Sequence, residues 1–272
     1  MDFQIKEQYN MDDLLKIMEI LRSPEGCPWD REQTHQSIRN NFIEETYEAV
    51  EAIDNNDTDL LKEELGDVLL QVVFHAQLEK EKNSFGFSDV VDGIVKKLIV
   101  RHPHVFDNTV VSNSDEVLVN WDAIKKKTKN QSTQSEVLQS VSKALPALMR
   151  SAKVQHKAAK VGFDWPDVSG ALDKVTEEVR ELKEAIDSGS GEDRMEELGD
   201  LLFSVVNVSR FLEVEPEQAL SNSCDKFIRR FQKMERLAEE RGADMASMSL
   251  EQLDSLWNEA KIMDHSQLSA VE

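Results

Sequence analysis

The sequence predicts an all-α protein, and three observations support this prediction. Apolar residues recur three and four positions apart along most of the chain, whereas the alternating pattern of a half-buried strand is scarce. Only 6% of the 272 residues are aromatic and only ten are Gly, which disfavours sandwiches and barrels with their many tight turns. Finally, one helix-rich segment occurs twice, which indicates a tandem repeat of helical-hairpin domains.

The first expected element is an amphipathic helix near the N-terminus. Leu14, Ile17, Met18 and Leu21 share one helical face, and the turn-forming residues 23–26 end it. Alternating strand patterns are scarce, and the segment 100–113 is the one stretch that we expect to be extended.

The repeated segment covers residues 44–73 and 177–206, EETYEAVEAIDNNDTDLLKEELGDVLLQVV and EEVRELKEAIDSGSGEDRMEELGDLLFSVV. Each copy predicts two helices joined by a short polar turn, at 54–58 and 188–191, so the helices fold back antiparallel. Each copy follows a Trp beside an Asp and precedes a basic pair. We therefore expect an N-terminal repeat at 1–125, a polar linker at 126–142 and a C-terminal repeat at 143–272.

Charge and composition exclude several classes of protein. With 32 Lys and Arg against 53 Asp and Glu, the net charge is −21, which argues against nucleic acid or an anionic membrane as partner. We see neither a secretory signal nor an apolar run long enough to span a bilayer. Two cysteines far apart in the sequence argue against a fold held by disulfides, and we expect a cytoplasmic protein.

The acids of each hairpin follow a geometric rule. Glu45 and Glu48 share a face of one helix, and Glu64 and Asp67 share a face of the next. Facing positions of an antiparallel hairpin have residue numbers with a constant sum, and the pairs 45/67 and 48/64 obey this rule. In the second copy the same rule joins Glu178 to Asp200 and Glu181 to Glu197.

Four converging carboxylates repel one another unless they take up protons or a hard cation. Oxygen ligands favour Mg²⁺, with Mn²⁺ as a substitute, over zinc. Gly66 and Gly199 lie between the acids of the second helix of each hairpin, where a close approach of backbone or ligand would explain a residue that disfavours helix.

Basic and aromatic residues follow both hairpins at helical spacing. They are Lys97, Arg101, Trp121 and Lys125 in the first half, and Lys226, Arg230, Trp257 and Lys261 in the second. Lys and Arg could neutralise a polyphosphate, and Trp could stack on a base. The alternative is an ordinary helix surface with a core Trp.

Three further residues of the second repeat lie beside its acids. Lys174 and Arg194 are one turn from the acids and could bind substrate or form local ion pairs. Glu177 could orient or deprotonate a water molecule, or be merely exposed. In the first repeat Asn41 stands where the second has Lys174. The histidines show no recognisable site pattern.

The segments GCPWDREQTHQSI, RHPHVF and VGFDW, together with the paired EExxE and ExxD patterns, resemble the MazG family of nucleoside triphosphate pyrophosphohydrolases. The resemblance spans nearly the whole chain. It implies an all-α, Mg²⁺-dependent enzyme that hydrolyses nucleoside triphosphates to monophosphate and pyrophosphate. It also implies a homodimer in which helical hairpins pack into four-helix bundles.

The resemblance assigns the metal ligands to Glu178, Glu181, Glu197 and Asp200, with Glu45, Glu48, Glu64 and Asp67 as their first-repeat counterparts. It implies that the second repeat is the main catalytic half. From these parts we expect Glu177, Glu178 and Glu197 to act in catalysis, with broad base tolerance and a housekeeping role in nucleotide pools.

Two other classes of function stay open at this point. One is a divalent-cation-binding protein without turnover, which the repeated basic pairs disfavour. The other is a purely structural helical protein whose acidic faces are solvated, for which neither Mg²⁺ nor nucleotide would change the melting temperature.

Overall fold

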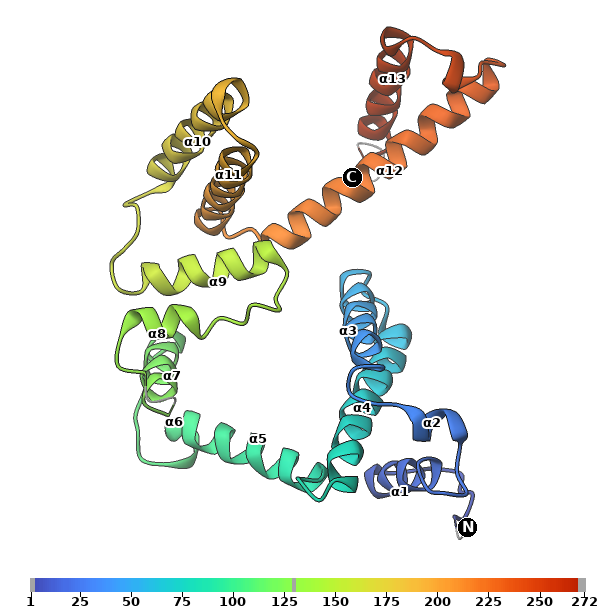
Figure 1. The fold of residues 1–272 in the computed structure, drawn as a ribbon, viewed down its shortest axis with the longest axis vertical. Coiled ribbons are helices and arrows are strands. Elements are labelled where there is room, and N and C mark those ends of the chain that lie inside the picture. Colours follow the sequence, from blue (N-terminus) through green and yellow to red (C-terminus); the bar gives the residue numbers. More distant parts are fainter. Residues whose placement is uncertain (1–2, 129–130, 269–272) are drawn as a thin grey trace. The chain divides into compact units, whose positions relative to one another are not determined.

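In the computed structural model the described residues are 3–128 and 131–268, and every regular element among them is a helix. The all-α prediction is confirmed. Segment 100–113, expected to be extended, includes the short helix α6 and no strand. The chain divides into two compact units, 1–125 and 126–272, and the helix order of the first recurs in the second (Figure 1).

The first unit is built on the hairpin of α3 and α4, against which α1 and α5 pack. Its elements are α1 (Met11–Leu21), α2 (Pro28–Glu32), α3 (Arg39–Asp54), α4 (Thr58–Glu81), α5 (Phe87–Arg101), α6 (Pro103–Phe106) and α7 (Ser114–Thr128), which runs past the unit boundary.

Local turn chemistry makes the first hairpin. Asn56 adopts φ 54°, a left-handed conformation that Asn tolerates better than most residues. Asp57 then caps α4 by accepting hydrogen bonds from the backbone N–H groups of Asp59 and Leu60. The polar turn seen in the sequence thus stops α3, starts α4 and reverses the chain.

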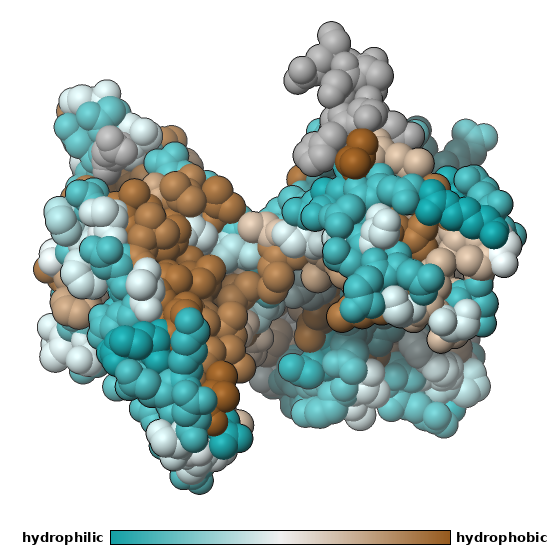
Figure 2. Space-filling model, turned by 90° about the horizontal axis from the view of Figure 1, so that it is seen from above, coloured by the Kyte–Doolittle hydropathy of each residue, from teal (hydrophilic) through white to brown (hydrophobic). Residues whose placement is uncertain are grey.

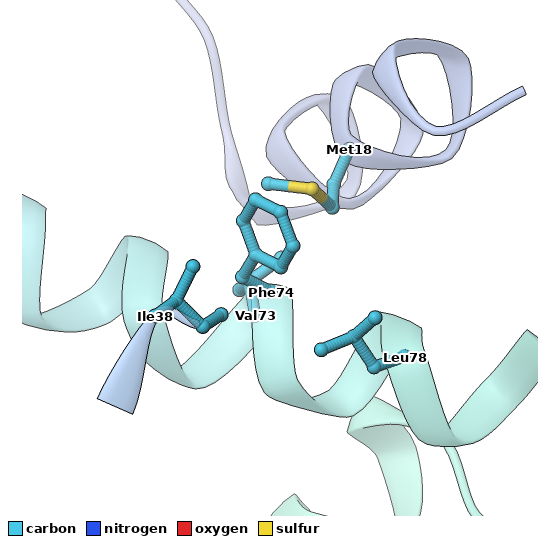
Figure 3. Packing of buried hydrophobic residues seen from close by; sticks show 5 residues of the cluster. All are labelled: Met18, Ile38, Val73, Phe74 and Leu78. Atoms are coloured by element: carbon cyan, nitrogen blue, oxygen red, sulfur yellow. The ribbon is translucent and has the colours of Figure 1, made fainter. Parts of the chain in front are cut away.

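The core of the first unit lies where α1 crosses α4. Figure 3 shows Met18 of α1 against Phe74, with Val73, Leu78 and Ile38 around them. Met18 and Val73 are each 1% exposed, so they are fully removed from water. This core fixes the end of α4 that lies beyond the acidic residues and includes none of them.

The second unit repeats this plan around the hairpin of α10 and α11, with α9 packed on α11. Its elements are α8 (Gln134–Gln139), α9 (Ala147–Ala159), α10 (Val168–Ser188), α11 (Gly191–Phe211), α12 (Pro216–Glu240), the 3₁₀ turn η1 (Met245–Ser247) and α13 (Leu250–Leu268).

Ser190 begins α11 in the second hairpin. Its side chain accepts a hydrogen bond from the backbone N–H of Asp193, and the Asp193 carboxylate accepts one from the N–H of Ser190, a reciprocal capping box. A two-residue connection, Gly189 and Ser190, is therefore enough to reverse the chain between two helices of 21 residues each.

The main core of the second unit lies between α12 and α13 rather than beside the hairpin. Leu256 and Ala260 of α13 pack against Met234, Leu237 and Ala238 of α12. Figure 1 shows α13 on the part of α12 that is away from the α10–α11 hairpin. The basic and aromatic residues of α12 and α13 are therefore held by a core of their own.

The segment that we interpreted as a linker, 126–142, contains the end of α7 and all of α8. Thr133 caps α8 in a capping box with Glu136. The linker role itself stays a prediction.

No described helix is both long and apolar enough to cross a membrane.

Candidate active site

The second hairpin brings three predicted ligands together. Glu178 from α10 and Glu197 and Asp200 from α11 each offer one carboxylate oxygen, and these oxygens lie within 4.8 Å of one another. Residues three apart on α11 share a face, and the antiparallel partner helix places Glu178 opposite that face. Oxygen atoms this close form a set that could hold a hard divalent cation.

Glu178 is the buried member of this cluster, with 3% of its surface exposed. Its Oε1 lies 2.5 Å from Nζ of Lys174, whereas its buried Oε2 has no hydrogen-bond partner among the described residues. Lys174 also lies 3.1 Å from Oε1 of Glu177, and hydrogen bonds to these two carboxylates raise the pKa of Lys174. A buried carboxylate oxygen without a donor is costly unless a ligand completes it.

The fourth predicted ligand, Glu181, lies outside the cluster of three. Its Oε1 is 2.9 Å from Nη2 of Arg180. Glu181 is nevertheless near enough to act on its neighbour: burial raises the pKa of Glu197, and the negative charges of Glu181, Glu178 and Asp200 raise it further. The structure thus gathers the charges of all four acids and the ligand oxygens of three.

The first hairpin forms a related cluster from Glu45, Glu48 and Glu64. Glu64 is the buried member here, with 8% exposure. Burial raises the pKa of Glu45 and of Glu64, and the charges of the neighbouring acids, including Asp67, add to both shifts. Asp67 contributes charge but no oxygen to this cluster, much as Glu181 does in the second hairpin.

The glycines between the acids do not mark a close approach within the protein. A Cβ built on Gly66 or on Gly199 would have no protein atom within 4 Å. The interpretation that neighbouring backbone requires a glycine there is therefore wrong, and the space beside both residues is open to a ligand or a second subunit.

The basic and aromatic residues of the second repeat form a group on α12 and α13. Arg230 lies over the ring of Trp257 at 5.9 Å, and its Nε is 2.8 Å from Oδ2 of Asp264. Phe227 also contacts Trp257, with ring centroids 5.0 Å apart. Lys226 is exposed on α12 and Lys261 is half-buried on α13. Figure 1 shows α13 away from the hairpin that carries the acids.

Arg194 has partners on the backbone of the hairpin turn. Its Nε donates to the carbonyl oxygen of Ala185 at 3.2 Å and its Nη2 donates to that of Gly189 at 3.1 Å. These contacts tie the start of α11 to the end of α10, where the Ala185 carbonyl also accepts a hydrogen bond from the backbone N–H of Gly189. Its substrate-binding role stays a prediction.

The counterpart group of the first repeat is spread over α5 and α7. Lys97 is exposed and Arg101 is half-buried at the end of α5, while Trp121 and Lys125 lie on α7. The Trp121 ring lies 5.9 Å from that of His102, and its buried Nε1 has no hydrogen-bond partner among the described residues.

One cluster in the first unit was missed by sequence reasoning. The rings of His35 and His75 stack 5.0 Å apart, with their Nδ1 atoms at 2.7 Å, and Nε2 of His35 lies 2.7 Å from Oε1 of Glu79. The expectation that the histidines form no group is wrong. The two histidines are 40 residues apart, a separation that carries no helical or turn signal.

Comparison with known proteins gives one consistent family. The model of the MazG nucleotide pyrophosphohydrolase domain matches residues 33–106 and again 168–235, so it finds both repeats. A nucleoside triphosphate pyrophosphohydrolase/pyrophosphatase MazG from Thermotoga maritima is 48% identical over 92% of this chain and 95% of its own. A nucleoside triphosphate pyrophosphohydrolase from Escherichia coli K12 is 44% identical over 92% of this chain and 97% of its own.

Among solved structures, the crystal structure of a mazG-related protein from Thermotoga maritima aligns with 43% of this chain and 99% of its own. The sequence identity of that alignment is 28% and the TM-score is 0.37. The domain model matches twice, and the two relatives align over 92% of this chain, which establishes the family. It belongs to the MazG nucleotide pyrophosphohydrolase family and carries two copies of the family's domain.

Proposed function

We propose that this protein hydrolyses nucleoside triphosphates to nucleoside monophosphate and pyrophosphate, with Mg²⁺ held in the second repeat. The observation that carries the proposal is the buried Glu178, whose Oε2 has no partner beside the carboxylates of Glu197 and Asp200. The curated relatives named for this reaction support the assignment.

The donor set fits a hard divalent cation. All the clustered ligand atoms are carboxylate oxygens, which suit Mg²⁺ and Mn²⁺. Glu178, Glu197 and Asp200 would hold the ion, with Glu181 adding negative charge. When bound, Mg²⁺ supplies charge neutralisation and polarisation of phosphate oxygens.

The side chains of the chain itself would perform the remaining steps. Exposed Glu177, next to the buried ligand Glu178, would orient the attacking water and accept its proton at Oε1 or Oε2. Lys226 and Arg230 would neutralise oxygens of the triphosphate, as guanidinium and ammonium groups do in other phosphoryl-transfer sites. Attack at the α-phosphorus releases pyrophosphate as the leaving group.

Base recognition in this proposal relies on stacking. Trp257 and Phe227 offer ring faces, and a ring face accepts any base. We therefore propose broad tolerance of the base and a housekeeping role in clearing surplus triphosphates.

We also propose that the protein is a homodimer. Apolar side chains on the surface of α10 and α11 recur at intervals of three, four and seven residues, as on a packing face. They are Leu172, Val179, Ile186, Met195, Leu198, Leu202 and Val205. Figure 2 shows hydrophobic residues joined in a continuous surface patch in its left half. Patches of this kind typically mark an interface, and two hairpins would close into a four-helix bundle.

Analytical ultracentrifugation tests the dimer. The proposal expects twice the chain mass of 31.0 kDa for the wild type, and a shift to monomer for Leu198→Asp combined with Leu202→Asp. A wild-type protein that sediments as a monomer at micromolar concentration would contradict it.

Anion-exchange analysis of the products tests the reaction. Each common triphosphate is incubated with the protein and Mg²⁺, and the expected products are monophosphate and pyrophosphate. Formation of diphosphate and orthophosphate would refute the proposed attack. Activity that survives Glu197→Gln but not Glu64→Gln would move the reaction to the first repeat.

A further inference from the structure

The two acid clusters differ in one charged neighbour. In the second repeat Nζ of Lys174 lies 2.5 Å from Glu178 and 3.1 Å from Glu177. The corresponding residue of the first repeat is Asn41, which is exposed and uncharged. One cluster therefore already contains a cation supplied by the chain, whereas no ion pair to Glu45, Glu48 or Glu64 is found among the described residues.

The Lys174 contact uses only half of the Glu178 carboxylate. Oε1 is paired with the ammonium group, whereas Oε2 is buried and has no partner. Glu178 is 3% exposed, so its own carboxylate is largely removed from bulk water. A divalent ion that joins Oε2 would have to share this carboxylate with a second positive charge.

We propose that Lys174 is an exchangeable cation that pairs with Glu178 before ligands bind and transfers to the triphosphate when metal and nucleotide bind together. The first repeat, with Asn41, would bind a divalent cation without nucleotide. This inference rests on the proposed function and deepens it, because it makes metal binding in the second repeat depend on substrate.

Simple electrostatics gives the direction of each effect. A divalent ion and an ammonium group on one carboxylate repel each other, which weakens binding of the metal alone. A triphosphate offers Lys174 new anionic partners. When nucleotide is present, both the divalent ion and the ammonium group are attracted to the phosphates, and they no longer share the Glu178 carboxylate. The two ligands then favour each other's binding by the same factor. Replacing Lys174 with an uncharged residue should therefore strengthen binding of Mg²⁺ alone and weaken binding of the nucleotide.

Calorimetry on the full-length chain tests this. The parent protein carries Glu45→Gln and Glu64→Gln, which prevent metal binding in the first repeat. One titrant is Mg²⁺ alone. The other is an α,β-methylene triphosphate, which is not cleaved, together with Mg²⁺. Lys174→Met should tighten binding of Mg²⁺ alone by about tenfold and weaken binding of the analogue by about tenfold.

Two variants serve as controls. Lys174→Arg keeps the charge and should behave as the parent in both titrations. Lys183→Met removes the same charge from an exposed position of α10 and should change neither affinity by more than about twofold.

The reciprocal experiment uses the first repeat. With Glu178→Gln and Glu197→Gln silencing the second site, Asn41→Lys should weaken binding of Mg²⁺ alone by about tenfold. Unchanged Mg²⁺ affinity in Lys174→Met would overturn the inference and leave the proposed function intact. A wild-type protein that takes up no Mg²⁺, with or without the analogue, would overturn both.

Discussion

The two repeats share a hairpin and an acid pattern, yet they bury different acids. In the first, Glu64 of α4 is the buried acid, whereas in the second it is Glu178 of α10. The first cluster has no Lys174 equivalent, and burial and mutual repulsion raise the pKa of Glu45 and Glu64. The comparison teaches that one acid pattern occurs in two settings, beside Lys174 in the second repeat and beside Asn41 in the first.

The largest expected effect separates the repeats by turnover. Glu178→Gln removes the charge of the buried acid that we propose as a metal ligand, and we expect a loss of about 100-fold or more in kcat/KM. Glu45→Gln makes the same change at the corresponding position of the first repeat and should keep most of the activity. Steady-state assays of pyrophosphate release measure both, with circular dichroism as a control for folding.

Equal losses in these two variants would show that the repeats act as one site. A loss only in Glu45→Gln would exchange their roles.

The next effect concerns the cores, which occupy different places in the two units. Phe74→Ala empties the α1–α4 core and should cost about 3–5 kcal/mol of unfolding free energy. Leu256→Ala, 2% exposed between α12 and α13, should cost about 2–5 kcal/mol and also loosen Trp257, which packs against the same cluster.

Urea denaturation measures both costs, and the KM for nucleotide distinguishes them. We expect KM to rise for Leu256→Ala and to stay near the wild-type value for Phe74→Ala. A rise in both would mean that the first core also supports the nucleotide site.

A third effect is confined to acid pH and to the first unit. Hydrogen bonds from Lys82 and then His35 lower the pKa of Glu79 from 4.5 to about 2. The ionised carboxylate thus stabilises the folded state fully above pH 4.5, and this contribution is lost as the pH falls toward 2. Burial, together with the nearby His35, lowers the pKa of His75, so stability also falls as the pH drops through 6.5.

Melting temperatures between pH 7 and pH 3 check this prediction. Glu79→Gln should flatten the acid limb of the curve, whereas Glu32→Gln, at an exposed position of α2, should leave it unchanged. The second repeat has Leu212 where the first has Glu79, so no matching change is expected there.

The smallest effect concerns the turn of the second hairpin. Arg194→Ala removes two hydrogen bonds to the end of α10, which should cost about 0.5–1.5 kcal/mol in stability. Leu61 occupies the corresponding position of the first hairpin and makes no such contact possible. A large rise in KM without loss of stability would instead favour the substrate-binding role.

Sequence reasoning predicted the helices and the hairpins because their signals are local. Asp57 and Ser190 cap helices through residues two or three positions away, and helical spacing alone puts Glu197 and Asp200 on one face. The facing of Glu178 and Asp200 required only that the turn be short.

What could not be predicted depends on contacts that no spacing encodes. Whether Glu178 or Glu197 is buried depends on how the hairpin packs, and the choice differs between the repeats. Glu181 forms an ion pair with Arg180, its neighbour in the sequence, and its oxygens lie outside the cluster. The stacking of His35 on His75 joins a loop to α4 across 40 residues and gives no periodic signal.

The most direct measurement is anomalous diffraction from a crystal grown with Mn²⁺ and the α,β-methylene triphosphate. We predict an anomalous peak in the second repeat for a manganese ion bound by carboxylate oxygens of Glu178, Glu197 and Asp200. We also predict that the Lys174 side chain contacts the phosphates. A second repeat without a manganese peak, or with Lys174 still paired to Glu178 beside bound nucleotide, would contradict this account.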